Sequence, residues 1–267
     1  MAKNGCVSFP GGSMYYVSFG RGMKKLIVLP GLSDGLATVK GKALLLESPY
    51  RPYLSDYTVF LFSRRNDLPA GFTIRQMAED QAAAISALGI GKSSVLGVSQ
   101  GGMIAQLLAA EHPELIEKLV LAVTAPGANK MTRACVERWI RFAEAGDHRA
   151  LMSDTAEHSY SPEKLRQYRK LYPVLGLVGR PSDYGRFLAN ARAILGFDAA
   201  AAIGKIAAPT LVIGGADDRI IGAEASRELA AGIPGAELYL YPGLGHAAYE
   251  EAGDFYTRVF RFLESGS

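Results

Sequence analysis

Residues 93–112 read SSVLGVSQGGMIAQLLAAEH, and this stretch decides the fold. Residues 93–98 are short and apolar, as in a buried strand, whereas residues 103–112 favour a helix that runs until Pro113. The sequence Gly97-Val98-Ser99-Gln100-Gly101 lies between them and matches the pattern G-x-S-x-G. Small neighbours allow a sharp turn from strand to helix, with the serine exposed in a strained conformation. The context therefore predicts that Ser99 is a nucleophile.

A second match to the same pattern occurs at residues 31–35, Gly-Leu-Ser-Asp-Gly. Its helix signal is weaker, because Pro30 precedes the turn and Gly41 interrupts the segment that follows. A serine on a G-x-S-x-G turn takes one of its oxyanion donors from a loop upstream of it. Residues 30–35 can supply that loop for Ser99, whereas only a hairpin-like segment precedes Ser33. Chain order therefore favours Ser99 over Ser33.

Strands alternate with helices along much of the chain, which predicts an α/β fold with a mainly parallel sheet. Short apolar runs bounded by Gly or Pro predict strands at 24–30, 57–62, 93–98, 118–123, 209–215 and 236–242. Helices are expected at 73–89, which starts on a Thr N-cap, at 103–112 and at about 250–264. Residues 5–19 are expected to add a hairpin.

The alternation stops between residues 127 and 205, where no strong strand pattern is present. Helical patterns occur there at 132–146, 161–172 and 182–195, and Ser161-Pro162 is a good helix start. A structureless loop of this length would be unusual. The sequence therefore predicts a helical insertion at 127–205 in a core formed by 1–126 and 206–267.

Composition narrows the class of protein. The chain has 267 residues, 49% hydrophobic and 21% charged, which suits one large domain or one domain with an insertion. The net charge is only +3 with no long basic run, so we expect no nucleic-acid partner. Two cysteines without metal-ligand spacing predict no metal site and fit a reducing compartment.

Neither a signal peptide nor a spanning segment is visible, so the expected location is cytoplasmic, with no membrane partner. We expect a monomer or a homodimer that binds a small-molecule substrate.

Five segments in order resemble the α/β-hydrolase family, and nearly the whole chain takes part. They are LIVLPGL (26–32), VLGVSQGG (95–102), KLVLAV (118–123), PTLVIGGADDRI (209–220) and LYPGLGHAAYEE (240–251). The resemblance implies the α/β-hydrolase fold, with the insertion at the place where the family carries its cap or lid. The motifs are specific for the fold and leave the substrate open.

The resemblance and the chain order together suggest a Ser, acid, His arrangement. His246 follows a strand and precedes the last helix, which favours it as the base. His112 ends a helix and is expected to be a surface helix cap. His148 and His158 lie in the insertion, where solvated or packing roles are expected. For the acid, the loop after 209–215 offers two neighbours, Asp217 and Asp218. The family pattern G-x-x-D favours Asp218.

Two backbone N–H groups are expected to form the oxyanion hole. One is the N–H of Gln100, which follows the nucleophile. Family register assigns the other to Leu32, although this chain has Pro30-Gly31 where many relatives have His-Gly. Ser33 lies beside this site, where it either contacts substrate or forms a turn with Asp34, and the turn is favoured.

This arrangement predicts hydrolysis of a small carboxylic ester or lactone through an acyl-enzyme on Ser99, without a metal or organic cofactor. A serine at this position argues against relatives with an Asp nucleophile, namely epoxide hydrolases and haloalkane dehalogenases. Thioesterase, C–C bond hydrolase, aminopeptidase and cofactor-free perhydrolase activities remain open. A ligand-binding receptor with an idle triad is the alternative from another class.

The insertion also concentrates positive charge. Residues 127–205 carry 13 Lys and Arg against 8 Asp and Glu. Long basic side chains usually remain exposed, so solvated helix faces are the simpler interpretation. The sharper hypothesis is that Arg186 or Arg192 turns inward over Ser99 and binds a substrate carboxylate.

Overall fold

The computed structural model describes residues 2–176 and 179–266. Within these residues, eight strands form one sheet in the order β1-β2-β4-β3-β5-β6-β7-β8. Strands β3 to β8 are parallel, while β2 pairs antiparallel with both β1 and β4. The strands are β1 Lys3–Phe9, β2 Gly12–Gly20, β3 Lys24–Leu29, β4 Tyr57–Arg65, β5 Ser93–Val98, β6 Ile116–Ala122, β7 Thr210–Gly215 and β8 Glu237–Tyr241. The predicted α/β fold with a mainly parallel sheet and an initial hairpin is confirmed.

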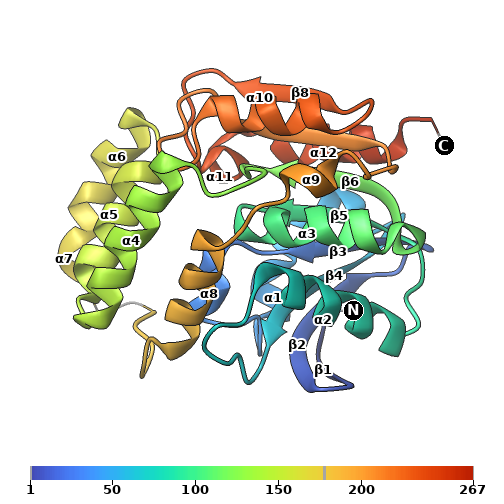
Figure 1. The fold of residues 1–267 in the computed structure, drawn as a ribbon, viewed down its shortest axis with the longest axis horizontal. Coiled ribbons are helices and arrows are strands. Elements are labelled where there is room, and N and C mark those ends of the chain that lie inside the picture. The colour runs from blue at the N-terminus through green and yellow to red at the C-terminus, as the bar shows by residue number, and fades with distance from the viewer. Residues whose placement is uncertain (1, 177–178, 267) are drawn as a thin grey trace.

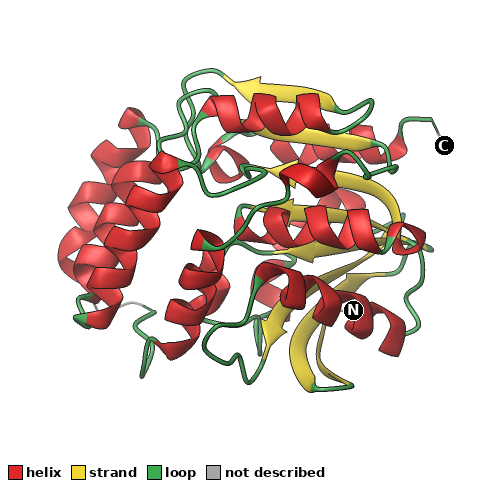
Figure 2. Cartoon of the chain, viewed as in Figure 1, coloured by secondary structure: helices red, strands yellow, loops and turns green. Residues whose placement is uncertain are grey.

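Helices cover both faces of this sheet (Figures 1 and 2). Those outside the insertion are α1 Ala43–Leu46, α2 Ile74–Ala87, α3 Gln100–Glu111, α10 Ala223–Gly232, α11 Ala248–Glu251 and α12 Phe255–Glu264. Strand β3 shows how both faces become apolar. Ile27 and Leu29 belong to the hydrophobic cluster that includes α2 and α3, whereas Leu26 and Val28 belong to the cluster that includes α12. Successive side chains point to opposite faces, so a strand covered on both sides is apolar throughout.

Two helix ends show what local sequence predicts well and poorly. The predicted Thr N-cap of α2 is confirmed: Thr73 Oγ1 accepts from the Gln76 backbone N–H, and Gln76 Oε1 accepts from the Thr73 N–H. The helix expected at 250–264 is instead two helices, α11 and α12. Ala252 between them has extended backbone (φ −76°, ψ 113°), and Gly253, a poor helix former, follows it.

Between β6 and β7 every described helix lies in residues 127–205, the predicted insertion. These are α4 Lys130–Glu144, α5 His148–Ser159, α6 Pro162–Tyr168, α7 Tyr172–Leu175, α8 Gly185–Leu195 and α9 Ala200–Ile203. Helices α4 to α7 lie together at one side of the sheet, and α8 lies between them and the core (Figure 1). Sequence patterns indicated α4, α6 and α8 but not α5, whose N-cap is Asp147.

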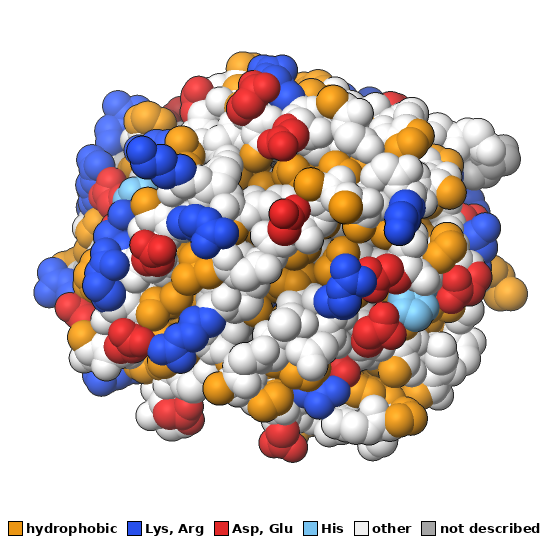
Figure 3. Space-filling model, in the orientation of Figure 1, with side chains coloured by type: hydrophobic (Ala, Val, Ile, Leu, Met, Phe, Trp, Pro, Cys, Tyr) orange, Lys and Arg blue, Asp and Glu red, His pale blue; other side chains and the backbone are white. Residues whose placement is uncertain are grey.

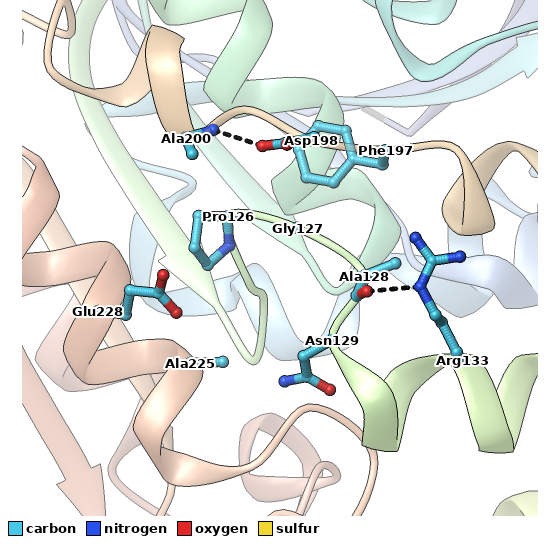
Figure 4. A pocket seen from close by; sticks show the side chains of 10 residues that line it. All are labelled: Pro126, Gly127, Ala128, Asn129, Arg133, Phe197, Asp198, Ala200, Ala225 and Glu228. Atoms are coloured by element: carbon cyan, nitrogen blue, oxygen red, sulfur yellow. Dashed lines mark hydrogen bonds between the residues drawn. The ribbon is translucent and has the colours of Figure 1, made fainter.

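The chain enters and leaves the insertion at one junction (Figure 4). Gly127 and Asp198 form an antiparallel bridge, and the Ala199 N–H donates to the Pro126 carbonyl at 2.7 Å. A hollow of about 290 Å³ lies at this junction. Two of its charged side chains bond to backbone there: Arg133 Nε donates to the Ala128 carbonyl, and Asp198 accepts from the Ala200 N–H. The bridge and the bond between Ala199 and Pro126 join the entering and leaving segments.

The part of the chain that the structure describes has neither a membrane-spanning helix nor a metal-binding cluster. In 2–176 and 179–266, no helix combines the length and the apolar character needed to cross a membrane. Over the same residues, His, Cys, Asp and Glu side chains form no group of three or more that could hold a metal ion.

Candidate active site

Ser99 occupies the turn between β5 and α3 in a conformation that L-residues rarely adopt, with φ 53° and ψ −117°. Backbone contacts hold it there. The Ser99 N–H donates to the Ala122 carbonyl at 2.8 Å, and Thr124 Oγ1 donates to the Ser99 carbonyl at 2.8 Å. Such strain persists only where surrounding structure enforces it, and it is concentrated at functional sites.

Two glycines explain how this turn fits. A Cβ atom at Gly101 would overlap the carbonyl oxygen of Leu29 on β3, and one at Gly102 would lie 2.6 Å from the Thr124 Cβ. Only glycine at these positions lets α3 approach the sheet so closely that Ser99 projects beyond the strand ends.

His246 links Ser99 to a buried carboxylate. Its Nε2 lies 2.9 Å from Ser99 Oγ, and its Nδ1 lies 2.7 Å from Asp218 Oδ2. The second carboxylate oxygen, Asp218 Oδ1, accepts from the N–H groups of Ile220 (2.8 Å) and Ile221 (3.0 Å). The network assigns the proton of the imidazole to Nδ1, so Nε2 is the acceptor for the serine hydroxyl.

The environment keeps the Asp218 carboxylate ionised. Burial alone raises its pKa, but the adjacent His246 imidazole and the two backbone N–H donors outweigh burial and hold the pKa below its ordinary value. Asp217 is exposed, and its backbone N–H donates to the Leu244 carbonyl at 2.9 Å. Of the two acids that the sequence left in competition, Asp218 is the one bonded to His246.

The other three histidines lie elsewhere. His112 contacts Glu79 at 3.1 Å, His158 contacts the Asp154 carbonyl at 2.8 Å, and His148 is buried in the insertion. None of them lines the cavity beside Ser99. Of the four histidines and the two competing acids, the structure places His246 and Asp218 beside Ser99.

The expected oxyanion donors also lie at this point. Gln100 is the first residue of α3, so its N–H has no acceptor within the helix. Leu32 begins a short 3₁₀ helix, Leu32–Gly35, and lines the same cavity as Ser99. The preceding Gly31 approaches so closely that a Cβ on it would lie 3.4 Å from the Ser99 Cβ.

A cavity of about 150 Å³ opens beside Ser99 and His246. Its walls combine the loop at residues 31–36 with side chains of the insertion and of the loops after β7 and β8. The other lining residues are Gly31, Leu32, Ser33, Leu36, Trp139, Leu151, Met152, Thr155, Ser159, Phe187, Ile220 and Tyr249. Ser33 therefore borders the cavity and also belongs to the 3₁₀ turn. The local sequence gave no signal for Met152, because only folding brings α5 to this point.

Neither Arg186 nor Arg192 lines this cavity, so the hypothesis of an inward arginine is wrong. Arg186 Nη2 pairs with Asp34 Oδ2 at 2.7 Å, and the rest of its guanidinium donates to backbone carbonyls of residues 34 and 64–66. Arg192 is half exposed and pairs with Glu144. Both guanidinium groups find acceptors outside the cavity. Many other Lys and Arg side chains lie on the surface at the left of Figure 3, where Figure 1 places α4 to α6.

A serine on a strand-to-helix turn, bonded to a histidine and through it to a buried aspartate above a mainly parallel sheet, defines a class of protein. The family model described as alpha/beta hydrolase fold matches residues 26–253, and the chain belongs to this family.

Curated relatives match almost the full chain at low identity. A proposed carbamate hydrolase, RutD, of Klebsiella pneumoniae is 26% identical over 90% of this chain and 91% of its own. A 2-hydroxy-6-oxononadienedioate/2-hydroxy-6-oxononatrienedioate hydrolase of a Pseudomonas species is 24% identical over 94% and 92%.

Solved structures agree on the fold. An alpha/beta hydrolase enzyme from a Medee basin deep-sea metagenome library has a TM-score of 0.84, at 20% identity over 98% of both chains. The enol-lactonase of Burkholderia xenovorans has a TM-score of 0.80, at 22% identity over 97% and 99%. The predicted alpha/beta hydrolase is confirmed at this level.

Proposed function

We propose that this protein is a serine hydrolase that cleaves a small carboxylic ester or lactone through an acyl-enzyme on Ser99. The observation that carries the proposal is the continuous set of hydrogen bonds from Asp218 through His246 to Ser99 Oγ, which ends in a cavity. A positioned base and an ionised carboxylate are what a serine needs to become nucleophilic.

The chemistry follows from the positions of the atoms. His246 Nε2 takes the hydroxyl proton as Ser99 Oγ attacks the carbonyl carbon, and the N–H groups of Leu32 and Gln100 bind the resulting oxyanion. His246 then returns the proton to the leaving oxygen, and the acyl group stays on Ser99. His246 Nε2 next takes a proton from water, whose oxygen attacks the acyl carbon. The bond from that carbon to Ser99 Oγ breaks, Oγ takes the proton back from His246, and the acid leaves. Asp218 stabilises the transient imidazolium throughout.

We further propose that residues 127–205 act as a lid over the core formed by 1–126 and 206–267. The insertion supplies Trp139, Leu151, Met152 and Phe187 to the cavity. These side chains would exclude bulk water from the reacting carbonyl, which strengthens the oxyanion contacts.

Other activities use the same set of groups. The names of the relatives include carbamate and C–C bond substrates, and thioesterase, aminopeptidase and perhydrolase activities fit the same three residues. A serine held 2.9 Å from its base weighs against a receptor with an idle triad. An ester or lactone asks less of the site than an amide or a C–C bond, because its leaving oxygen needs only the proton that His246 carries.

The test compares two serines. Ser99→Ala should lower hydrolysis of p-nitrophenyl acetate on the order of a thousandfold or more, while Ser33→Ala retains substantial activity. A fluorophosphonate should label the wild type at Ser99, as mapped by mass spectrometry. Loss of activity in Ser33→Ala with Ser99→Ala still active would reverse the assignment. Stoichiometric binding of small esters without turnover would favour the receptor.

A further inference from the structure

The cavity beside Ser99 is small. Its volume of about 150 Å³ lies below the roughly 300–1,000 Å³ of pockets for drug-sized ligands. An apolar cavity of about 150 Å³ accommodates a molecule the size of benzene. Trp139, Leu151, Met152 and Phe187 form much of its wall, so its chemistry is mainly apolar.

The lining also lacks a charged partner for a charged substrate. Among the described residues that border the cavity, there is no Lys, Arg, Asp or Glu. The indole N–H of Trp139 already donates to Asp154 Oδ2 at 2.8 Å, and the Thr155 hydroxyl donates to the Leu151 carbonyl at 2.8 Å. A carboxylate placed here would lose its hydration without gaining an ion pair, which is unfavourable.

We propose that the site selects substrates whose acyl group is uncharged and no larger than about six carbon atoms, the size of benzene. This inference rests on the proposed function. The proposed preference for an uncharged acyl group distinguishes this chain from the relative named for a dioate substrate. A dicarboxylate would place a negative group in or near a lining that has no Lys or Arg.

A series of methyl esters from acetate to decanoate, followed by proton release at constant pH, tests the size limit. We expect kcat/KM to rise by up to about fourfold for each methylene that becomes buried, and to fall about tenfold once the acyl group overfills the cavity. Met152→Ala should move the optimum to longer chains. Met131→Ala, an exposed methionine on α4 outside the cavity, should not.

Equal rates across the whole series would overturn the size limit while leaving the serine hydrolase intact. No hydrolysis of any ester by the wild type, together with no labelling of Ser99, would instead refute the proposed function.

Charge is tested with monomethyl glutarate and its terminal amide, which have nearly the same shape. The amide should react at least tenfold faster at both low and high salt, because the cost is local desolvation rather than long-range repulsion. Equal rates for the acid and the amide would overturn the preference for an uncharged acyl group.

A second feature, independent of the cavity, is the buried guanidinium of Arg64 at the end of β4. Arg64 is 1% exposed. Its Nη2 donates to the Pro30 carbonyl at 2.6 Å and to Gln100 Oε1 at 3.1 Å. One nitrogen therefore contacts both segments that carry the proposed oxyanion donors: the loop of Leu32 and the start of α3.

Neighbouring contacts complete the support of this loop. The Arg64 backbone N–H donates to Asp34 Oδ2 at 3.0 Å, and Arg186 Nη2 donates to the same oxygen at 2.7 Å. The Asp34 N–H in turn donates to the Gly31 carbonyl at 3.3 Å. On the other side, Gln100 Nε2 donates to the Asn190 carbonyl on α8 at 2.8 Å. Hydrogen bonds therefore fix the positions of both the loop and the Gln100 side chain.

Arg64 is costly for the fold. Burial lowers the pKa of its guanidinium to about 10, with nearby Arg186 adding to the effect and Asp34 opposing it. Apolar residues of similar volume can often replace even a buried ion pair without loss of stability. Retaining a cation here points to a role beyond packing.

We infer that Arg64 is a positioning residue that sets the spacing between the Leu32 and Gln100 N–H groups, so that both reach the same oxyanion. It acts only through the Pro30 carbonyl and the Gln100 side chain. Since a displacement of about 1 Å in a catalytic geometry can cost on the order of a hundredfold, loss of this contact should slow turnover.

Arg64→Met should lower kcat about 10- to 100-fold with KM within about threefold of the wild type. Ki for butylboronic acid, which forms a tetrahedral adduct with a catalytic serine, should rise by the same factor as kcat falls. Arg64→Lys should recover part of the loss. The melting temperature should fall by no more than a few degrees, because the variant also removes a buried charge.

Arg65→Met is the matched control. Arg65 bonds to Asp80 on α2 and lies over Phe72, and its side chain contacts neither donor segment. We expect it to lower the melting temperature while kcat stays within about twofold, since it is outside the site. The inference is overturned if Arg64→Met leaves kcat unchanged, or if its kcat falls without a matching rise in Ki. Both results assume active wild-type enzyme, so they are separate from failure of the proposed function.

Discussion

Replacing Asp218 with Asn changes one atom in a position where the surroundings fix how the new side chain must lie. Asp218 Oδ1 accepts from two backbone N–H groups, those of Ile220 and Ile221. An Asn must keep its carbonyl oxygen on these donors, because its NH₂ group cannot accept them. The NH₂ group then faces His246 Nδ1, 2.7 Å from the present oxygen. The imidazole responds by moving its proton to Nε2, the nitrogen that must accept the proton of Ser99.

The size of the effect follows from this inverted tautomer. We expect kcat to fall about ten thousandfold, as the same substitution does in another serine hydrolase. At about 1.36 kcal/mol per factor of ten, the barrier rises by about 5.5 kcal/mol. Hydrolysis of p-nitrophenyl acetate and the rate of labelling by a fluorophosphonate should fall together, because both need a deprotonated Ser99.

Asp217→Asn is the internal control, since its exposed carboxylate lies next in sequence yet outside the hydrogen-bonded set. Its kcat should stay within about twofold of the wild type, as is usual for surface substitutions. The reasoning fails if Asp218→Asn keeps more than about a tenth of wild-type turnover, or if the two variants lose equally.

Three further predictions address the turn at Ser99 and the surface of the insertion. Gly102→Ala should lower the free energy of unfolding, measured in urea, by about 1–3 kcal/mol, because the new Cβ overlaps Thr124. Gly253→Ala has open space around it and should change that free energy by less than about 0.5 kcal/mol. Equal changes in the two variants would contradict this prediction. Thr124→Val removes the donor to the Ser99 carbonyl and should reduce both stability and kcat, and an unchanged kcat would show that this bond does not hold the nucleophile. The Arg169 guanidinium lowers the pKa of Glu157 to about 2, so their contact stabilises the fold above the ordinary glutamate pKa, and this stabilisation is lost as pH falls towards 2. The difference in melting temperature between wild type and Glu157→Gln should therefore shrink over that pH range. A constant difference would show that ionised Glu157 does not stabilise the fold.

Local pattern was sufficient for the elements of the core. A strand covered by helices on both faces of the sheet buries every side chain and is therefore apolar throughout. For this reason β3, β5 and β7 could be located from short apolar runs. The turn at Ser99 was also readable, because its glycines lie within three residues of it and their need for space is local. Thr73 marked the start of α2 for the same reason: a cap bonds only to residues of its own first turn.

The partners of side chains in loops and in the insertion depended on packing between distant parts of the chain. The family pattern favoured Asp218, but Asp217 and Asp218 have the same side chain. The path of the loop against residues 244–246 turns Asp218 towards His246 and Asp217 to solvent. The sequence allows Arg186 to face Ser99. In the structure α8 packs so that the guanidinium of Arg186 donates to Asp34 and to a carbonyl at the end of β4 instead. The small neutral cavity and the buried Arg64 arise in the same way: each is formed by segments that meet only when the sheet and the insertion come together.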